Sequence, residues 1–228
     1  MWNQSKTKIF EWVLLFACIL ISIFVSPWFS IDPINQGKMT LMVPLAFALL
    51  VLLSISKGII NKNANLRYIA ILGLFVFQLT LVLLFSGAPF GQQFYGTFGR
   101  NTGFLTYISL AIFAFSASLV STLGFIRKFS YSLIAVGFIS AIYSLFQTFG
   151  YDPFPWVSGY NAITGFLGNP NFQSSFLGIS SAASFAFLID NSQIIRQRLL
   201  ALFYVFLSLF LIIRSDSLQG ILVLAGGI

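Results

Sequence analysis

Basic side chains in this chain fall in alternate gaps between long apolar segments, and this alternation limits the fold more than any other feature. Nine of the twelve Lys and Arg residues occupy every other gap. They are Lys6, Lys8, Lys57, Lys62, Arg67, Arg127, Lys128, Arg196 and Arg198. Cytoplasmic loops of membrane proteins carry such an excess of Lys and Arg. The pattern predicts a chain that crosses a membrane repeatedly, with its N-terminus in the cytoplasm.

The apolar segments predict an all-α fold, a polytopic bundle of transmembrane helices. Charged residues make up only 7% of the chain, against about 25% in a soluble domain. The segments are continuously apolar and do not alternate, which indicates helices and not barrel strands. We expect seven spans and the start of an eighth, at about residues 10–25, 39–55, 68–85, 103–121, 129–149, 172–189, 199–213 and 218 onward.

The last segment limits how much of the protein this chain represents. Residues 218–228 would extend about 17 Å as a helix, roughly half of the hydrocarbon layer. We therefore expect residues 1–228 to form a single transmembrane helical domain, truncated at its C-terminal end. Further spans and a large outer loop would follow in the complete protein.

Charge and composition exclude several classes of function. The net charge of +7 sits beside the spans, where it faces anionic lipid headgroups and not nucleic acid. The chain has no histidine, so it offers no histidine base and no histidine metal site, and we expect no metal and no cofactor. The single cysteine, Cys18, excludes a disulfide framework.

Two features of the spans predict helix contacts. Ser174, Gly178, Ala182 and Ala186 recur every four residues. They form a stripe of small residues that lets another helix approach closely. Gln147 lies within the fifth predicted span, where we expect it to donate a hydrogen bond between helices.

Arg100 lies in one of the outer gaps, where the distribution of basic residues gives it no reason to be. It is part of Gly96-Thr97-Phe98-Gly99-Arg100-Asn101-Thr102-Gly103, directly before the fourth predicted span. The glycines let backbone N–H groups approach a ligand, a helix N-terminus adds positive potential, and a guanidinium suits phosphate oxygens. The segment therefore predicts either an anion site at the outer face or an interfacial arginine that contacts lipid phosphate.

The outer gap before the sixth span carries the sequence Gly168-Asn169-Pro170-Asn171. Asn-Pro favours a turn, and we expect Asn171 to be the N-cap of the sixth helix. Asn169 then has no structural role, and its carboxamide can bind sugar hydroxyls or a diphosphate.

Arg214 lies in the tight outer gap Arg214-Ser215-Asp216-Ser217. Arg214 either pairs with Asp216 or meets the same ligand as Arg100. Together, Arg100, Asn169, Asn171 and Arg214 are the candidate substrate-binding residues, and no catalytic residue is assigned. Their placement is consistent with a lipid-linked diphosphate whose tail lies in the bilayer.

Two motifs resemble those of a known family. Residues 100–107, Arg-Asn-Thr-Gly-Phe-Leu-Thr-Tyr, followed by residues 168–172, Gly-Asn-Pro-Asn-Phe, resemble the O-antigen ligase-like (O-antigen ligase/polymerase) family of bacterial membrane proteins. The resemblance implies a multi-pass enzyme of the bacterial plasma (inner) membrane that makes cell-envelope polysaccharide. Such an enzyme is a metal-independent glycosyltransferase. It moves a glycan from undecaprenyl diphosphate to a glycan, lipid or protein acceptor at the outer face, and it uses outward arginines to hold the diphosphate.

The chain departs from this family in two places. The family activates the acceptor with a histidine in a large outer loop, and this chain has no histidine. Family members often carry Ser-Arg-Gly where the eighth span begins, whereas this chain reads Ser217-Leu218-Gln219-Gly220. The fragment alone is therefore expected to be inactive, and the role of Arg214 depends on whether it replaces the missing arginine.

A membrane transporter or flippase for a small solute or a polyprenyl-linked lipid is the alternative function. Transporters place charged groups or broken helices near the middle of the bilayer. Here the polar residues gather at one rim, which favours the transferase. A non-catalytic scaffold would leave the two polar loops unexplained.

Overall fold

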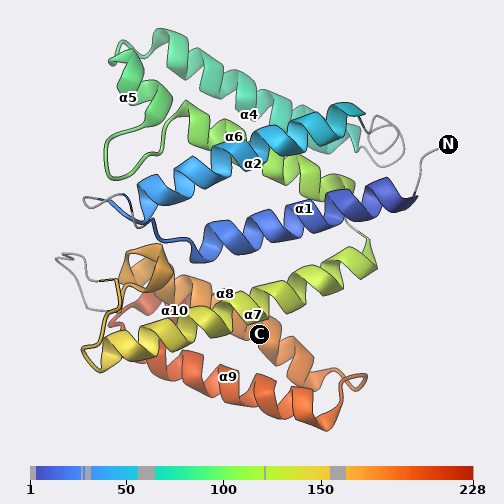
Figure 1. Ribbon diagram of the computed structural model, residues 1–228, viewed down its shortest axis with the longest axis vertical. Coiled ribbons are helices and arrows are strands. Elements are labelled where there is room, and N and C mark those ends of the chain that lie inside the picture. The colour runs from blue at the N-terminus through green and yellow to red at the C-terminus, as the bar shows by residue number, and fades with distance from the viewer. Residues whose placement is uncertain are drawn as a thin grey trace. The chain divides into compact units, whose positions relative to one another are not determined.

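A computed structural model of the chain describes residues 4–26, 28, 32–55, 65–120, 122–154 and 163–227. Lys57, Lys62 and residues 155–162 lie outside these ranges. The described residues form nine α-helices and one 3₁₀ turn, with no strand among them (Figure 1). They are α1 (Gln4–Ile23), α2 (Asn35–Ile55), α4 (Leu66–Phe85), α5 (Phe90–Tyr95), α6 (Phe104–Leu119), α7 (Leu123–Thr148), η1 (Gly165–Leu167), α8 (Pro170–Ile189), α9 (Ile195–Arg214) and α10 (Leu218–Gly227). The predicted all-α class is confirmed.

Each predicted span corresponds to one helix, and several of these helices are those of a multi-pass membrane protein. Helices α2, α4, α7, α8 and α9 are long and apolar enough to cross a membrane. Helices α6 and α10 are apolar but shorter. The sequence did not predict α5, a short helix between α4 and Arg100.

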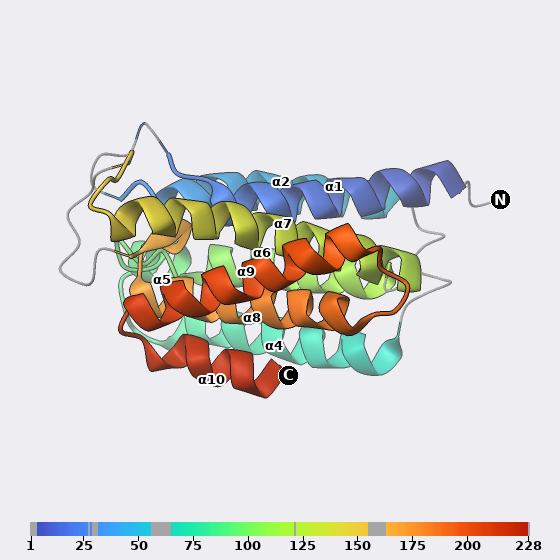
Figure 2. The same cartoon turned by 90° about the horizontal axis from the view of Figure 1, so that it is seen from below.

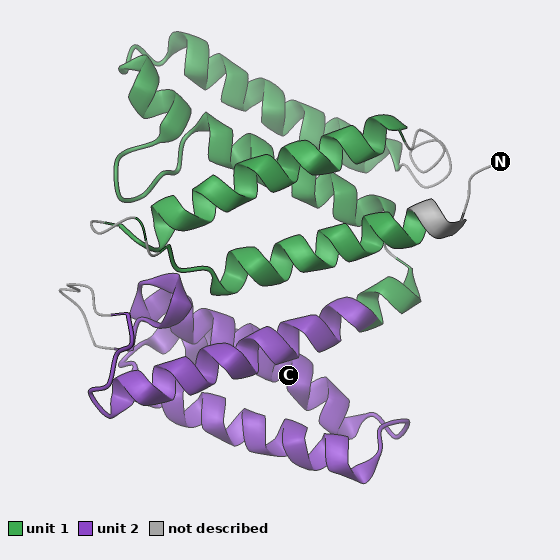
Figure 3. Ribbon diagram, viewed as in Figure 1, with its two compact units in different colours: residues 1–127 green, residues 128–228 purple. Residues whose placement is uncertain are grey.

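The chain divides into two compact units, residues 1–127 and 128–228 (Figure 3). The expectation that residues 1–228 form a single transmembrane domain stays a prediction.

Unit 1 is built around α2 and α6. Helix α6 packs against α2 and α4, and α1 packs against α2. Its core includes Phe10, Leu15, Leu49 and Leu119, all nearly inaccessible to solvent. Helix α4 buries none of its residues, so its large apolar side chains face outward. Such a surface suits lipid and not water.

Unit 2 packs α8 against both α9 and α10 (Figures 1 and 2). Its core combines Ala141 of α7 with Leu177 of α8 and with Tyr204, Leu211 and Ile212 of α9. The predicted small-residue stripe of α8 is confirmed as a close helix contact, because a Cβ added at Gly178 would lie 2.7 Å from the Gly220 carbonyl oxygen of α10.

Candidate functional site

The loop that carries Arg100 is closed at its base by two glycines. A Cβ at Gly96 would lie 2.6 Å from the Gly103 nitrogen, and a Cβ at Gly103 would lie 2.5 Å from the Phe94 carbonyl oxygen. Gly96 also has φ +91°, which favours glycine. The two ends of the loop therefore touch, and any larger residue at either glycine would force them apart.

The tip of this loop is fixed by hydrogen bonds to two helices of unit 1. Asn35, at the start of α2, donates from Nδ2 to the Gly99 carbonyl oxygen at 2.7 Å. Thr106 Oγ1, in the first turn of α6, donates to the Asn101 carbonyl oxygen at 2.5 Å. Arg100 lies between these two anchored residues and its side chain is exposed. The loop thus presents the guanidinium from a fixed backbone.

Lys38, another basic residue of the gaps predicted to lie outside, has a structural role. Its Nζ donates to the carbonyl oxygens of Ile21 at 2.8 Å and Ser22 at 2.7 Å. These carbonyls belong to the last turn of α1, where a cation satisfies unpaired acceptors and complements the helix dipole. Lys38 is therefore engaged by the protein itself, in contrast to the exposed Arg100.

Asn169, and not Asn171, is the N-cap of α8, so the prediction for Asn171 is wrong. Asn169 has an extended backbone and its side chain accepts a hydrogen bond from the Asn171 nitrogen at 2.9 Å. Pro170 takes the first helical position, which needs no N–H and suits the fixed φ of proline. The expectation that Asn169 has no structural role is also wrong. The side chain of Asn171 is exposed.

Arg214 is the last residue of α9. The chain turns at Asp216, which has φ +55°, and re-enters a helix at Leu218. Ser217 of this turn pairs with Ser174 of α8, with their Oγ atoms 2.8 Å apart. Unit 2 therefore brings Asn169, Asn171 and Arg214 to one end of the same helix group. Arg100 lies in unit 1, whereas the other three candidate residues lie in unit 2.

A polar network fixes the loop after α7. The Asp152 carboxylate accepts hydrogen bonds from Tyr143 Oη at 2.7 Å, Gln147 Nε2 at 2.9 Å and the Phe154 nitrogen at 2.9 Å. Gln147 also binds the Gly165 nitrogen through Oε1 at 2.8 Å. The prediction that Gln147 links two helices is therefore wrong, since it links α7 to the loop that follows. The three hydrogen bonds to the Asp152 carboxylate hold this loop against the end of α7.

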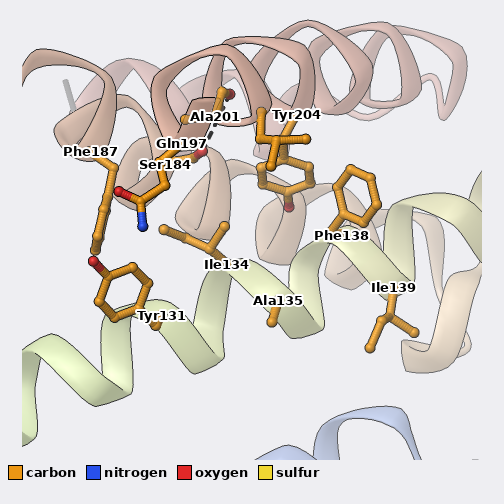
Figure 4. Close-up of a pocket in the computed structure, with 11 residues that line it drawn as sticks. Tyr131, Ile134, Ala135, Phe138, Ile139, Ser184, Phe187, Gln197, Ala201 and Tyr204 are labelled. Atoms are coloured by element: carbon orange, nitrogen blue, oxygen red, sulfur yellow. Dashed lines mark hydrogen bonds between the residues drawn. The ribbon is translucent and has the colours of Figure 1, made fainter. Parts of the chain in front are cut away.

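The other end of unit 2 holds an apolar groove of about 490 Å³ (Figure 4). Figure 4 shows Phe138 of α7 and Tyr204 of α9 with their rings close together, and Ser184 donating to the Ala201 carbonyl oxygen. The Tyr204 hydroxyl lies 2.6 Å from Ser180 Oγ, so its polar end is satisfied. This lining is mostly apolar and suits hydrocarbon, and none of the described residues that line it is a Lys or Arg.

A second cavity adjoins the loop of Arg100, and the sequence did not reveal it. Gln36 and Thr40 line it from α2, and Asn101 lines it from the loop. The only sequence signals are the four-residue spacing of Gln36 and Thr40, which places both on one helix face, and the position of Asn101 next to Arg100.

The fold and these sites define a multi-pass helical membrane protein with polar loops at the helix ends. Compared with known protein families, curated proteins and solved structures, the chain matches none. Among the described residues, no group of His, Cys, Asp and Glu could hold a metal ion.

Proposed function

We propose that this chain belongs to a membrane glycosyltransferase of the O-antigen ligase type. The donor is a glycan on undecaprenyl diphosphate, and the acceptor is a glycan, lipid or protein at the outer face of the bacterial plasma membrane. The observation that carries the proposal is the loop from Gly96 to Gly103, which holds the exposed Arg100 on a fixed backbone between two hydrogen-bonded residues.

The chemistry requires a cation at the position of the leaving group. The acceptor hydroxyl forms a bond to the anomeric carbon, and the bond from that carbon to the diphosphate oxygen breaks. The diphosphate leaves with the electron pair, and the hydroxyl proton passes to a base. A guanidinium that binds the diphosphate stabilises the charge that develops on it, and such electrostatic help is commonly the largest contribution to the rate. The base is expected in the large outer loop that the resemblance to the family implies.

The positions of the charges favour this function over transport. A transporter needs charged or broken-helix features near the middle of the bilayer. In the described part of the chain, Lys38 is bound to the end of α1, and Asp152 is bound to α7 and its loop. The exposed Arg100 lies at a helix end, where a headgroup would meet it.

The test replaces Arg100 in the complete protein and measures glycan transfer from a polyprenyl diphosphate donor. Arg100→Ala is expected to lower transfer by at least about a hundredfold at unchanged abundance, in the range seen when one oxyanion-stabilising donor is lost. Arg100→Lys is expected to retain part of the activity, because an ammonium keeps the charge but not the planar fork.

Arg196→Ala is the matched control, since Arg196 is an exposed arginine at the opposite end of α9 from Arg214. It is expected to leave transfer unchanged. Full activity of Arg100→Ala at normal abundance would reject Arg100 as the residue that binds the diphosphate. Movement of an intact polyprenyl-linked lipid across the membrane, without glycan transfer, would support the flippase instead.

A further inference from the structure

Helix α4 has a partner within unit 1 on one side only. It lies at the edge of unit 1, and none of its 20 residues is buried (Figures 1 and 3). The Tyr68 hydroxyl donates to the Ala114 carbonyl oxygen of α6, at 3.4 Å. The Phe75 ring meets the Tyr107 ring of α6 edge to face, with the ring centres 6.3 Å apart. These contacts define the side of α4 that faces α6.

The other side of α4 is exposed along its length. The half-buried side chains of the partnered side recur every three or four residues. They are Leu72, Val76, Leu79 and Leu83. Residues two positions apart on a helix point in nearly opposite directions, because each residue turns the helix by about 100°. Leu74 and Gln78, each two positions from Val76, therefore face away from α6, and both are exposed.

The exposed side carries a row of residues whose spacing is alternately three and four. This row, the α4 row, consists of Ile71, Leu74, Gln78, Leu81 and Phe85. Ile71 is 63% exposed, Leu74 68% and Phe85 77%. The spacing is that of the a and d positions of a coiled coil, where two helices pack along one seam. Many transmembrane helices pack with the same crossing angle. The α4 row therefore fits a second helix.

Gln78 is the polar residue of the α4 row, and lipid alone does not satisfy it. It lies about 4 Å along the axis from the middle of the helix, far from both surfaces of a hydrocarbon layer about 30 Å thick. Its side chain makes no hydrogen bond to the residues that the structure describes. An amide without a partner in hydrocarbon is unfavourable. Lipid tails can cover Leu74 and Phe85, but the Gln78 amide requires a polar group on another helix.

A second copy of this chain supplies that group at the required depth. All copies insert in the same orientation, because the same Lys and Arg residues orient each of them. Gln78 therefore lies at one depth in every copy. A carboxamide has both donors and an acceptor, so two facing Gln78 side chains are complementary. Arg67, one turn before Ile71, lies at the end of the helix, where its guanidinium can extend to the headgroups.

We propose that the protein forms a parallel homodimer through α4, in which Gln78 hydrogen bonds to Gln78 of the partner subunit. A two-fold axis along the membrane normal relates the two copies, so each position of the α4 row meets the same position of its partner. A single polar residue at an a position sets the register and the number of helices in a coiled coil. Gln78 has this role here, and the proposal is independent of the proposed function.

The first test is disulfide cross-linking in membranes. Cys18 is replaced by serine, and Leu74→Cys and Val76→Cys are introduced separately. Copper phenanthroline then oxidises the membranes. Leu74→Cys is expected to give a covalent dimer, because facing positions of a coiled-coil seam lie within reach of a disulfide. Val76→Cys is the matched control at nearly the same depth. It should remain a monomer, because Val76 lies on the side that faces α6.

The second test measures dimer dissociation in liposomes by energy transfer between labelled copies. Gln78→Leu should raise the dissociation constant about tenfold, the effect of losing an interhelical hydrogen bond in a membrane. It removes no contact within the chain, so the thermal unfolding of the monomer should not change. Gln219→Leu removes an exposed carboxamide of unit 2. This control should stay within about twofold of the wild type.

Several results would overturn the dimer. A wild type that stays monomeric, or equal cross-linking of Leu74→Cys and Val76→Cys, would contradict it. An unchanged dissociation constant in Gln78→Leu would exclude Gln78 from the interface and reject the proposal. If the monomer persists and Leu74→Cys is also shielded from a label dissolved in the lipid, another helix of the same protein covers the α4 row, and the second copy is the wrong occupant.

Discussion

Asn35 Nδ2 donates to the Gly99 carbonyl oxygen at 2.7 Å, a contact between residues 64 positions apart. This hydrogen bond joins the start of α2 to the loop of Arg100. The orientation of that loop therefore depends on a helix that comes before α4 in the chain. Asn35 is therefore a positioning residue for the loop of Arg100.

The first prediction concerns this contact. Asn35→Ala removes the donor from the Gly99 carbonyl, and the loop from Gly96 to Gly103 should open more often. Hydrogen exchange of peptides that cover residues 96–103 should become at least about threefold faster, the effect of losing about 0.7 kcal/mol of local stability. Asn65→Ala, which removes the cap at the start of α4, should not change exchange in these peptides. Unchanged exchange in Asn35→Ala would show that this hydrogen bond does not hold the loop.

The second prediction separates the two asparagines before α8. Asn169→Ala removes the side chain that accepts from the Asn171 nitrogen, and it should lower the free energy of unfolding by about 1 kcal/mol. Asn171→Ala should change it by less than about 0.5 kcal/mol, since its side chain is exposed. Thermal unfolding in detergent measures both. The reverse ranking would restore Asn171 as the cap.

The third prediction concerns the contact between α8 and α10. Gly178→Ala places a Cβ 2.7 Å from the Gly220 carbonyl oxygen, and the resulting overpacking should cost about 1–3 kcal/mol. Gly73→Ala is the matched control, because a Cβ there meets nothing within 4 Å. It should leave stability unchanged or raise it slightly, as alanine favours helix more than glycine does. Equal effects of the two substitutions on unfolding would contradict the close crossing.

The fourth prediction concerns the loop after α7. Asp152→Asn replaces one carboxylate oxygen with an amide, which turns a donor toward Gln147 Nε2 or Tyr143 Oη. One of those donors loses its acceptor, and the free energy of unfolding should fall by about 1–3 kcal/mol. Tyr143→Phe removes only one donor and should cost less. An unfolding midpoint unchanged by Asp152→Asn would show that this carboxylate does not order the loop.

The helices could be predicted, because the length of an apolar segment that forms a helix follows from the thickness of the bilayer. The stripe from Ser174 to Ala186 even predicted a close helix contact. Its partner, Gly220 of α10, could not be predicted, because periodicity within one helix does not identify the helix that packs against it.

The side-chain contacts of the loops could not be predicted, because they depend on local backbone conformation and on packing. Asn169 and Asn171 flank a proline, and both residue types cap helices, so only the backbone conformation decides between them. Gln147 bonds to Asp152 and Gly165 because the chain reverses directly after α7, which no spacing in the sequence reveals. The cavity at Asn101 depends on how the closed loop packs against α2, and Gln36 is more than 60 residues away.

The position of Arg100 at the outer face is the claim on which the proposed function most depends, and cysteine labelling in intact cells tests it directly. Cys18, the only cysteine in the chain, is first replaced by serine. Arg100→Cys and Arg196→Cys are then introduced separately and treated with a maleimide that cannot cross the membrane. We predict that position 100 is labelled in intact cells and that position 196 is labelled only after lysis. Labelling of position 100 only after lysis would place the guanidinium in the cytoplasm and contradict the account.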